Sequence, residues 1–254
     1  MRFNFIFLLA FLSACSGVSV NESYYPYMAS EENTLAPNTR VIIATNNFGV
    51  PSRAYLQRFE ERVDNVVKNR LRENGFSIVS SRLYDAAYAE AISKFGNPFN
   101  SSTGNLNSER LGNVLGYTFH QLKQDNAADA IIFTDLVAKE TAVIRSDSKR
   151  FTRFDGVQRK MKIQGAGGSV GENFDWNANI DVASLAINLF TIDGARILHN
   201  MGGLDNADAI NTRKNSFSRS RTLMKDDKFI IEAVELALHP VIFSDLYVEQ
   251  RQQQ

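Results

Sequence analysis

The segment from Trp176 to Ile192 constrains the fold of this chain more than any other. Apolar side chains occupy both parities of this run around Leu185–Phe190, which is typical of a central strand covered on both faces. Asp193-Gly194 follows at once and fits a type I′ turn into a second strand, Ala195–His199. The sequence therefore predicts a long β-hairpin in the middle of a layered domain.

The start of the domain has the pattern of a strand, a helix and a second strand. Thr39–Thr45 is a β-branched run that predicts a buried strand. Ser52 suits the N-cap of a helix whose apolar residues recur at helical spacing, and Asn74-Gly75 offers a left-handed position to end it. Phe76–Ser80 is then a short strand, and this β-α-β order predicts a right-handed parallel crossover.

Three more helices and one more strand complete the pattern. Helices are expected over residues 83–95 and 108–126, joined by a long polar loop, 96–107, that by default would be mobile or functional. A strand is expected over 129–137, with a continuation to 144 left open, and Asp226 or Asp227 can cap a closing helix. The expected fold class is α/β (α+β), a mixed β-sheet flanked by helices.

The N-terminus carries an export signal. Arg2 precedes an apolar run, 3–14, that is too short to span a bilayer as a stable helix. Leu12-Ser13-Ala14-Cys15 resembles the bacterial lipobox, which implies that Cys15 becomes the acylated first residue, carrying fatty acids such as palmitate. Ser16 rather than Asp follows, which in that resemblance implies sorting to the outer membrane. The alternative is an ordinary secretory peptide with an incidental cysteine.

These signals divide the chain into four parts: a lipoprotein signal peptide, 1–14; a flexible tether from lipidated Cys15, 15–38; a single periplasmic α/β domain, 39–241; and a polar C-terminal tail, 242–254. Lys plus Arg equals Asp plus Glu at 28 each, so the composition gives no reason to expect a nucleic-acid partner. Cys15 is the only cysteine, so the domain cannot form an internal disulfide.

Four segments resemble a known family. The strand before Asn46, the helix end at Asn74-Gly75, the strand entry Ala127–Ile132 and the hairpin Ile180–Leu198 look like the curli-secretion (CsgG-like) lipoproteins and the related amino-terminal domain of TolB. The resemblance covers roughly residues 39–241. It implies the mixed α/β fold, and either binding to envelope proteins or an oligomeric outer-membrane secretion channel.

The resemblance to the curli-secretion lipoproteins implies that a channel would need two membrane hairpins per subunit, and membrane strands need roughly 9–11 residues with one apolar face. Val157, Met161 and Ile163 partly obey this alternation, but Arg159 has the same parity and would point toward lipid. The segments 145–154 and 212–222 obey it badly. We therefore expect these segments to be water-exposed hairpins or loops, and we do not favour the channel.

The same segments are locally basic and form a candidate patch for an anionic partner, such as lipid headgroups or an acidic protein face. The candidate residues are Lys149, Arg150, Arg153, Arg159, Lys160, Lys162, Arg213, Lys214, Arg219 and Arg221. The alternative, left open, is a solvated surface whose neighbouring carboxylates compensate these charges.

Evidence for catalysis or a metal site is slight. The string from Gly167 to Gly171 matches the nucleophile elbow around Ser169, but no helix is expected after it. His120, His199 and His239 lack metal-ligand spacing, and Cys15 is assigned to lipid. We expect no catalytic residue, metal or cofactor.

The sequence thus favours a lipid-anchored outer-membrane protein that faces the periplasm and acts as a protein-binding accessory module. Such a protein would have an envelope protein as its partner and could form a homo-oligomer. The alternatives are a CsgG-like secretion channel component and a periplasmic serine hydrolase.

Overall fold

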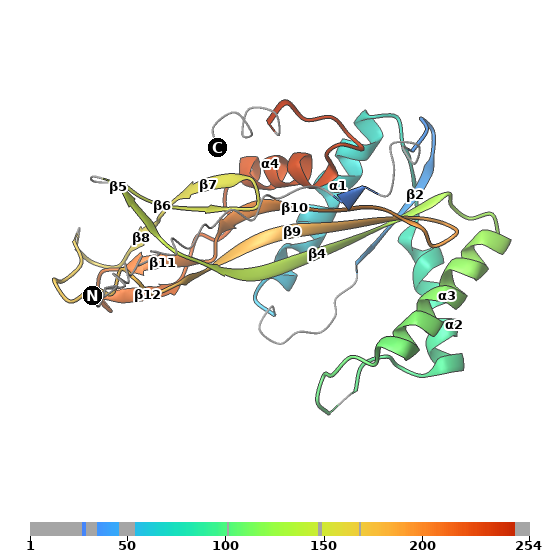
Figure 1. The fold of residues 1–254 in the computed structure, drawn as a ribbon, viewed down its shortest axis with the longest axis horizontal. Helices are drawn as coiled ribbons and strands as arrows, with labels where there is room; N and C mark the ends of the chain where they lie inside the picture. The colour runs from blue at the N-terminus through green and yellow to red at the C-terminus, as the bar shows by residue number, and fades with distance from the viewer. Residues whose placement is uncertain are drawn as a thin grey trace, which may run out of the picture.

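The computed structural model describes residues 27–28, 35–45, 54–100, 102–146, 149–167 and 169–246. The predicted signal peptide and Cys15 lie outside these ranges, as do Ser52 and residues 247–254. The described residues form a mixed α/β fold, so the predicted fold class is confirmed (Figure 1).

A six-stranded sheet forms the body of the protein, in the order β1-β10-β9-β4-β2-β3. Its strands are β1 (Tyr27–Met28), β2 (Arg40–Thr45), β3 (Ser77–Val79), β4 (Ala130–Thr141), β9 (Ile180–Thr191) and β10 (Arg196–Asn206). Strand β2 is parallel to β3 and β4, whereas β9 is antiparallel to both β4 and β10. The predicted β-α-β opening and the later long hairpin are both present.

In the described part of the chain, four helices lie on the two faces of this sheet. One pair is α1 (Glu60–Glu73), preceded by a 3₁₀ turn at Gln57–Phe59, and α4 (Asp227–Leu238); the other is α2 (Ser81–Phe95) and α3 (Ser108–Gln124). Of the two predicted caps, Asp226 and Asp227, it is the side chain of Asp226 that caps α4, by accepting a hydrogen bond from the backbone N–H of Lys228. Helix α1 begins later than the N-cap at Ser52 would place it.

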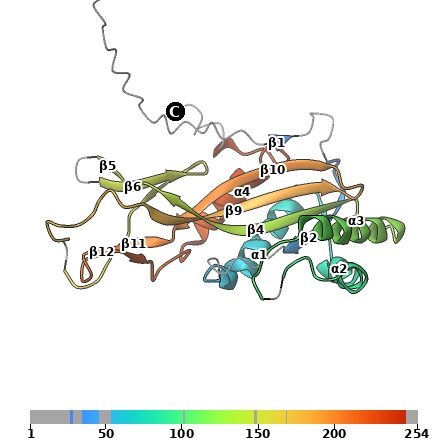
Figure 2. The same ribbon diagram turned by 60° about the horizontal axis from the view of Figure 1, so that its bottom comes forward.

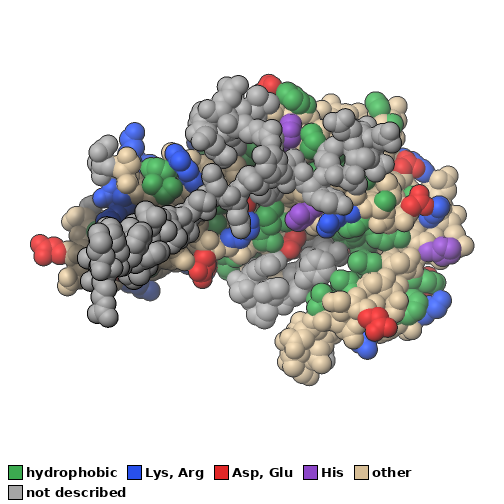
Figure 3. All heavy atoms as spheres, viewed as in Figure 1, with side chains coloured by type: hydrophobic (Ala, Val, Ile, Leu, Met, Phe, Trp, Pro, Cys, Tyr) green, Lys and Arg blue, Asp and Glu red, His purple; other side chains and the backbone are tan. Residues whose placement is uncertain are grey.

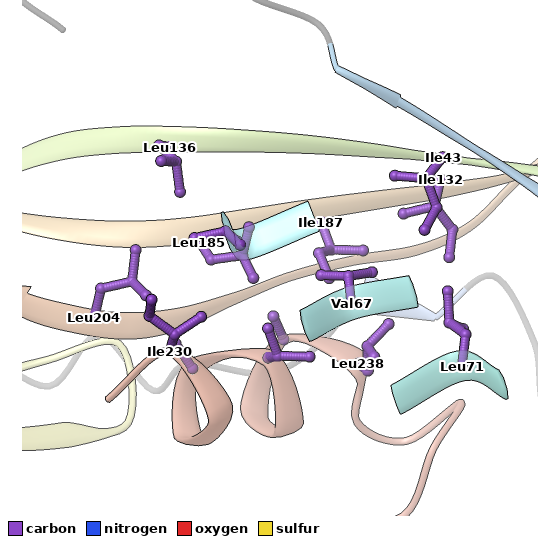
Figure 4. Packing of buried hydrophobic residues seen from close by; sticks show 14 of the residues in the cluster. Ile43, Val67, Leu71, Ile132, Leu136, Leu185, Ile187, Leu204, Ile230 and Leu238 are labelled. Carbon is purple, nitrogen blue, oxygen red and sulfur yellow. The ribbon is translucent and has the colours of Figure 1, made fainter. Parts of the chain in front are cut away.

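Two hydrophobic clusters show that the central strands are covered on both faces. One cluster packs α1 and α4 against the sheet, and Figure 4 shows Val67, Leu71, Ile230 and Leu238 of these helices pointing toward Ile187 and neighbouring strand residues. The second cluster lies on the other face, where α2 and α3 pack on β2, β4 and β9. The two-parity apolar pattern of β9 is therefore explained by burial on both sides.

Beyond the helix-covered part, the long strands run into two small sheets that we call the arm. One sheet contains β5 (Ile144–Ser146), β6 (Lys149–Phe154) and β7 (Val157–Lys160); the other contains β8 (Ile163–Gln164), β11 (Asp208–Asn211) and β12 (Ser216–Arg219). Figures 1 and 2 show the arm at one end of the molecule and α2 and α3 toward the other. The elongated sheet thus separates two projecting parts.

The turn chemistry differs from the prediction in an instructive way. A type I′ turn needs positive φ at both central residues, and in the β9–β10 connection only Gly194 has it, at 85°. The type I′ prediction for Asp193-Gly194 is therefore wrong, because that loop is longer and closes through Thr191 and Ala195. The dipeptide Asp155-Gly156, between β6 and β7, has φ values of 39° and 78° and does satisfy the rule.

Two predicted boundaries also change, and the loop between α2 and α3 is held by side-chain hydrogen bonds. Strand β1 pairs with β10 inside the range predicted to be a tether, 15–38. Ile242 and Ser244 are buried, so the packed domain continues past the predicted boundary at 241. The loop 96–107 is organised rather than open, because Asn100 accepts hydrogen bonds from the backbone of residues 102 and 103, and Arg110 donates to the carbonyl oxygen of Asn97.

Candidate functional site: a cationic face on the arm

The outward face of the β5–β6–β7 sheet is the candidate site, and we call it the cationic face. Strand pairing places its members side by side: Phe151 lies opposite both Ile144 and Lys160, Lys149 opposite Ser146, and Arg153 opposite Gln158. The seven members of the cationic face are Ile144, Ser146, Lys149, Phe151, Arg153, Gln158 and Lys160. Three carry positive charge and none is acidic.

The three cations of this face lie close together without a counter-charge among its members. Lys149 and Arg153 each stand two residues from Phe151, so each is diagonal to Lys160. Diagonal neighbours in an antiparallel pair are about 7–8 Å apart. All three side chains are exposed, and Figure 3 shows Lys and Arg side chains over this end of the molecule with apolar atoms among them. Such a face suits an anionic partner.

Apolar surface is interleaved with these charges. Ile144 retains 37% of its surface exposed, and Phe151 is half-buried. The guanidinium of Arg153 lies over the Phe151 ring, 5.5 Å from its centroid, and Arg153 Nε donates to Gln158 Oε1 at 3.1 Å. The ring and the neighbouring amide therefore orient one of the three cations.

The opposite face of the same hairpin is buried, and Arg159 belongs to it. Arg159 pairs with Glu232 of α4 at 2.7 Å and donates to the carbonyl oxygens of Gly203 and Leu204 on β10, at 3.1 and 2.7 Å. Its guanidinium also lies 4.2 Å from the Phe229 ring centroid. Arg159 is 5% exposed, so the prediction that it belongs to a surface patch is wrong.

Two more candidate cations are also held by carboxylates within the fold. Lys162 contacts the buried Asp205 at 2.5 Å. Arg219 bridges Asp181 and Asp208, at 2.9 and 3.2 Å, and stacks on the Tyr55 ring. Burial raises the pKa of Asp208 despite this pairing with Arg219. Lys162 and Arg219 thus join the arm to the body. The prediction that they belong to a patch open to an anionic partner is wrong.

The remaining candidate residues lie outside the cationic face. Arg150 points to the other side of its strand and lies over the Trp176 ring, 5.0 Å from the centroid. Arg213 and Lys214 are exposed in the β11–β12 turn, where Asn211 Oδ1 accepts both of their backbone N–H groups at 3.1 Å. Arg221 is exposed just after β12. The predicted patch is therefore divided over two small sheets.

Hydrogen bonds and an ion pair of Asp155 hold the tip of the β6–β7 hairpin against the body sheet. Asp155, in the turn, accepts a hydrogen bond from Ser184 Oγ at 2.5 Å and pairs with Lys139 at 2.9 Å. The backbone carbonyl of Asp155 accepts from Gly203 N–H at 2.9 Å. A Cβ at Gly203 would overlap Val157 and the Phe154 carbonyl oxygen, so the close approach requires glycine there. These contacts fix the orientation of the cationic face.

A groove of about 500 Å³ between α1 and α4 has a different character. Arg62 pairs with Asp227 at one end, and Val66 and Ile231 contribute apolar surface along it. Arg70 pairs with Glu235 farther along the two helices, at 3.1 Å. Each of these cations thus has a carboxylate beside it, unlike those of the cationic face.

The residues considered for catalysis or metal binding are scattered. Ser169 is exposed in the connection between β8 and β9, which has neither the strand before it nor the helix after it that an elbow needs. His120 is exposed on α3, His199 bonds Asn188 on the sheet, and His239 follows α4. Burial lowers the pKa of His199, and Arg196 and Lys139 act in the same direction. Within the described ranges, no group of three His, Cys, Asp or Glu side chains is placed to hold a metal ion.

Comparison with known proteins gives little further guidance. No protein-family model and no curated protein matches the chain. A solved structure titled as a homolog of neuraminyllactose-binding hemagglutinin from Helicobacter pylori is similar at 10% identity and a TM-score of 0.31, covering 89% of this chain and 97% of that one. A likeness this distant supports no inference about function. None of the helices in the described ranges is both long and apolar enough to cross a bilayer.

Proposed function

We propose that this protein is a lipid-anchored component of the cell envelope, held at the outer membrane and facing the periplasm, whose α/β domain acts as a protein-binding accessory module. The lipobox-like sequence ending at Cys15 supports the anchor. The α2–α3 hairpin is the observation that carries the binding role, because it projects from the sheet at the end opposite the arm, where a partner protein can reach it (Figures 1 and 2).

The fold supports this role through its shape. The hairpin of α2 and α3 projects from one side of the sheet at the end opposite the arm (Figure 1), and Asn side chains hold its connecting loop. Leu106 near the tip of this hairpin is 45% exposed. A rigid sheet that presents two separate surfaces can contact a membrane or partner at one end and a protein at the other.

The anchor is tested by metabolic labelling. Cells that express the protein are given radioactive palmitate, with and without globomycin, and a Cys15→Ser variant serves as the matched control. We expect label in the wild type alone and a mobility shift under globomycin. A wild-type product that carries no label would overturn the anchored placement.

The protein-binding role is tested by photo-crosslinking in cells. A photoreactive amino acid replaces Asn113 on the exposed side of α3 or Leu106 near the hairpin tip, and the same substitution at Asn69 on α1 controls for non-specific capture. We expect one discrete protein adduct from the hairpin positions, absent from the control. If both hairpin positions gave only unmodified monomer, the proposed protein-binding role would be contradicted.

A further inference from the structure

From the cationic face we infer its partner: an anionic phospholipid headgroup layer, against which the arm lies. The inference rests on the proposed function, because the predicted anchor at Cys15 is what keeps the domain beside a bilayer. It goes further by assigning the cationic face to lipid and leaving the α2–α3 end free for a protein partner.

The chemistry of the face matches a headgroup layer. Lys149, Arg153 and Lys160 present three charges on long side chains, and lipid phosphates can rearrange to meet them. Phe151 lies between these charges and Ile144 lies beside it on β5, where their apolar surface can enter the boundary between headgroups and acyl chains. The same cations could also pair with carboxylates of an acidic protein, so the test below includes a readout that distinguishes lipid from protein.

Chain geometry keeps the face within reach of the bilayer. Strand β1 pairs with β10, so residue 27 is fixed on the body sheet. The chain from Cys15 to Tyr27 can span at most about 40 Å when fully extended. The arm belongs to the same tethered domain, so its effective concentration at the membrane surface is high and weak individual contacts suffice.

The arm is also held firmly enough to set an orientation. Arg159 ties β7 to α4 and β10, and Asp155 ties the hairpin tip to Ser184 and Lys139. The buried face of the hairpin is thus fixed to the body while the cationic face remains open. Contact between this face and lipid would therefore orient the whole domain.

The test uses the full chain carrying Cys15→Ser, so that no acyl anchor contributes. Its co-sedimentation is measured with vesicles of phosphatidylcholine alone and with vesicles containing about a third phosphatidylglycerol. We expect preference for the anionic vesicles, weakened by salt because exposed charges are screened. The leader, which carries Arg2, is the same in every variant, so its contribution cancels when variants are compared on the same vesicles.

The decisive variant is K149E/R153E/K160E, and its matched control, R58E/R72E/R82E, makes the same charge change at exposed cations elsewhere. We expect the first triple to lose on the order of a hundredfold in binding to anionic vesicles, and the control to stay within about twofold. Circular dichroism melting confirms folding, and the milder K149Q/R153Q/K160Q variant should lose binding in the same direction.

Equal binding to both vesicle types, or an unchanged first triple, would overturn the inference. A photoreactive residue at Gln158 gives a second check: a phospholipid adduct supports the inference, and a discrete protein adduct shows an acidic protein there instead. None of these results depends on acylation or on the α2–α3 crosslinks, so failure here is distinguishable from failure of the proposed function.

Discussion

Arg159 is a charged residue on the buried, otherwise apolar side of β7. Its guanidinium supplies hydrogen-bond donors to β10 that a neighbouring strand would otherwise supply. The carbonyl groups of Gly203 and Leu204 accept from its guanidinium, and Glu232 supplies the counter-charge. Buried polar groups need such partners, because an unsatisfied acceptor or carboxylate carries its full desolvation cost. The residue therefore acts in folding and not at the surface.

Replacing Arg159 by Met should destabilise the protein by about 2–4 kcal/mol, because Glu232, at 26% exposed, would lose its partner together with two backbone carbonyls. Urea unfolding followed by circular dichroism measures the change. Adding Glu232→Gln should recover part of the loss, and Lys160→Met on the exposed side should change stability by less than about 0.5 kcal/mol. Equal effects at Arg159 and Lys160 would contradict the assignment.

Asp129 acts at the start of two parallel strands. The Arg40 guanidinium donates to both of its carboxylate oxygens, at 2.7 and 3.1 Å, and the Arg40 backbone N–H donates at 2.8 Å. These hydrogen bonds hold the pKa of Asp129 below its ordinary value. The register of β2 with β4 is thus fixed at the first residue of the pair.

This pairing predicts a pH dependence with a definite sign. A carboxylate whose pKa is lowered on folding contributes stability above its unfolded pKa, about 4, and loses that contribution as the pH falls through the folded value. We expect Asp129→Asn to be less stable than wild type near neutral pH, with the difference shrinking below about pH 4. A difference that stays constant through acid titration of the unfolding free energy would refute this.

Among the elements, α4 and the body sheet approach closely at a glycine. A Cβ on Gly202 would overlap the Ala233 carbonyl oxygen of α4. Gly203, the next residue, allows the β6–β7 hairpin to approach the opposite face in the same way. One dipeptide thus permits close packing on both sides of β10.

Gly202→Ala should therefore destabilise the protein by about 3 kcal/mol, because backbone and not a flexible side chain must move. Gly112→Ala is the matched control, since nothing lies near its Cβ position in α3, and it should stabilise by up to about 1 kcal/mol. Thermal unfolding of the two variants compares them directly. Similar changes in stability from the two substitutions would show that α4 can move to make room for a side chain at position 202.

The three cations on the β5–β6–β7 sheet repel one another, and this repulsion lowers the stability of the sheet. Lys160→Glu would place a carboxylate diagonal to Lys149 and Arg153, so we expect a gain of about 0.5 kcal/mol at low salt that disappears at high salt. Chemical unfolding at two salt concentrations measures it. A loss of stability at low salt would mean that these cations have other counter-charges.

In the whole molecule, one elongated sheet separates the arm from the α2–α3 hairpin (Figure 1). The body core contains residues from α1, α4 and four strands, whereas the arm has a small cluster around Met161, Phe174 and Ile210. Regions with fewer buried contacts open at lower free energy. The arm should therefore be the less stable part of the fold.

Hydrogen–deuterium exchange can test this difference. We expect backbone amides of β6 and β7 to exchange at least about tenfold faster than those of β9, because the body must open for the latter. Protection in the arm equal to that of β9 would show that arm and body unfold as one unit. Anionic vesicles should slow exchange in the arm if the cationic face contacts lipid.

Elements with local signals can be predicted from the amino-acid sequence alone. The β-α-β opening follows from a β-branched run, a helical repeat and a turn, and the central β9–β10 hairpin from apolar residues on both parities. The Asp-Gly signal was correct as chemistry but was assigned to the wrong turn, since Asp155-Gly156 adopts it instead. Local patterns identify elements because propensity and periodicity act within a few residues.

Which basic residues remain on the surface depends on contacts that form only when the chain folds. Arg159 shares the parity of Val157 and Met161, which hinted at burial, but its partner Glu232 lies far along the chain. The carboxylates that hold Lys162 and Arg219 are likewise brought close only by folding. Electrostatic pairing depends on distance in space, so the cationic face emerges only once the strands are paired.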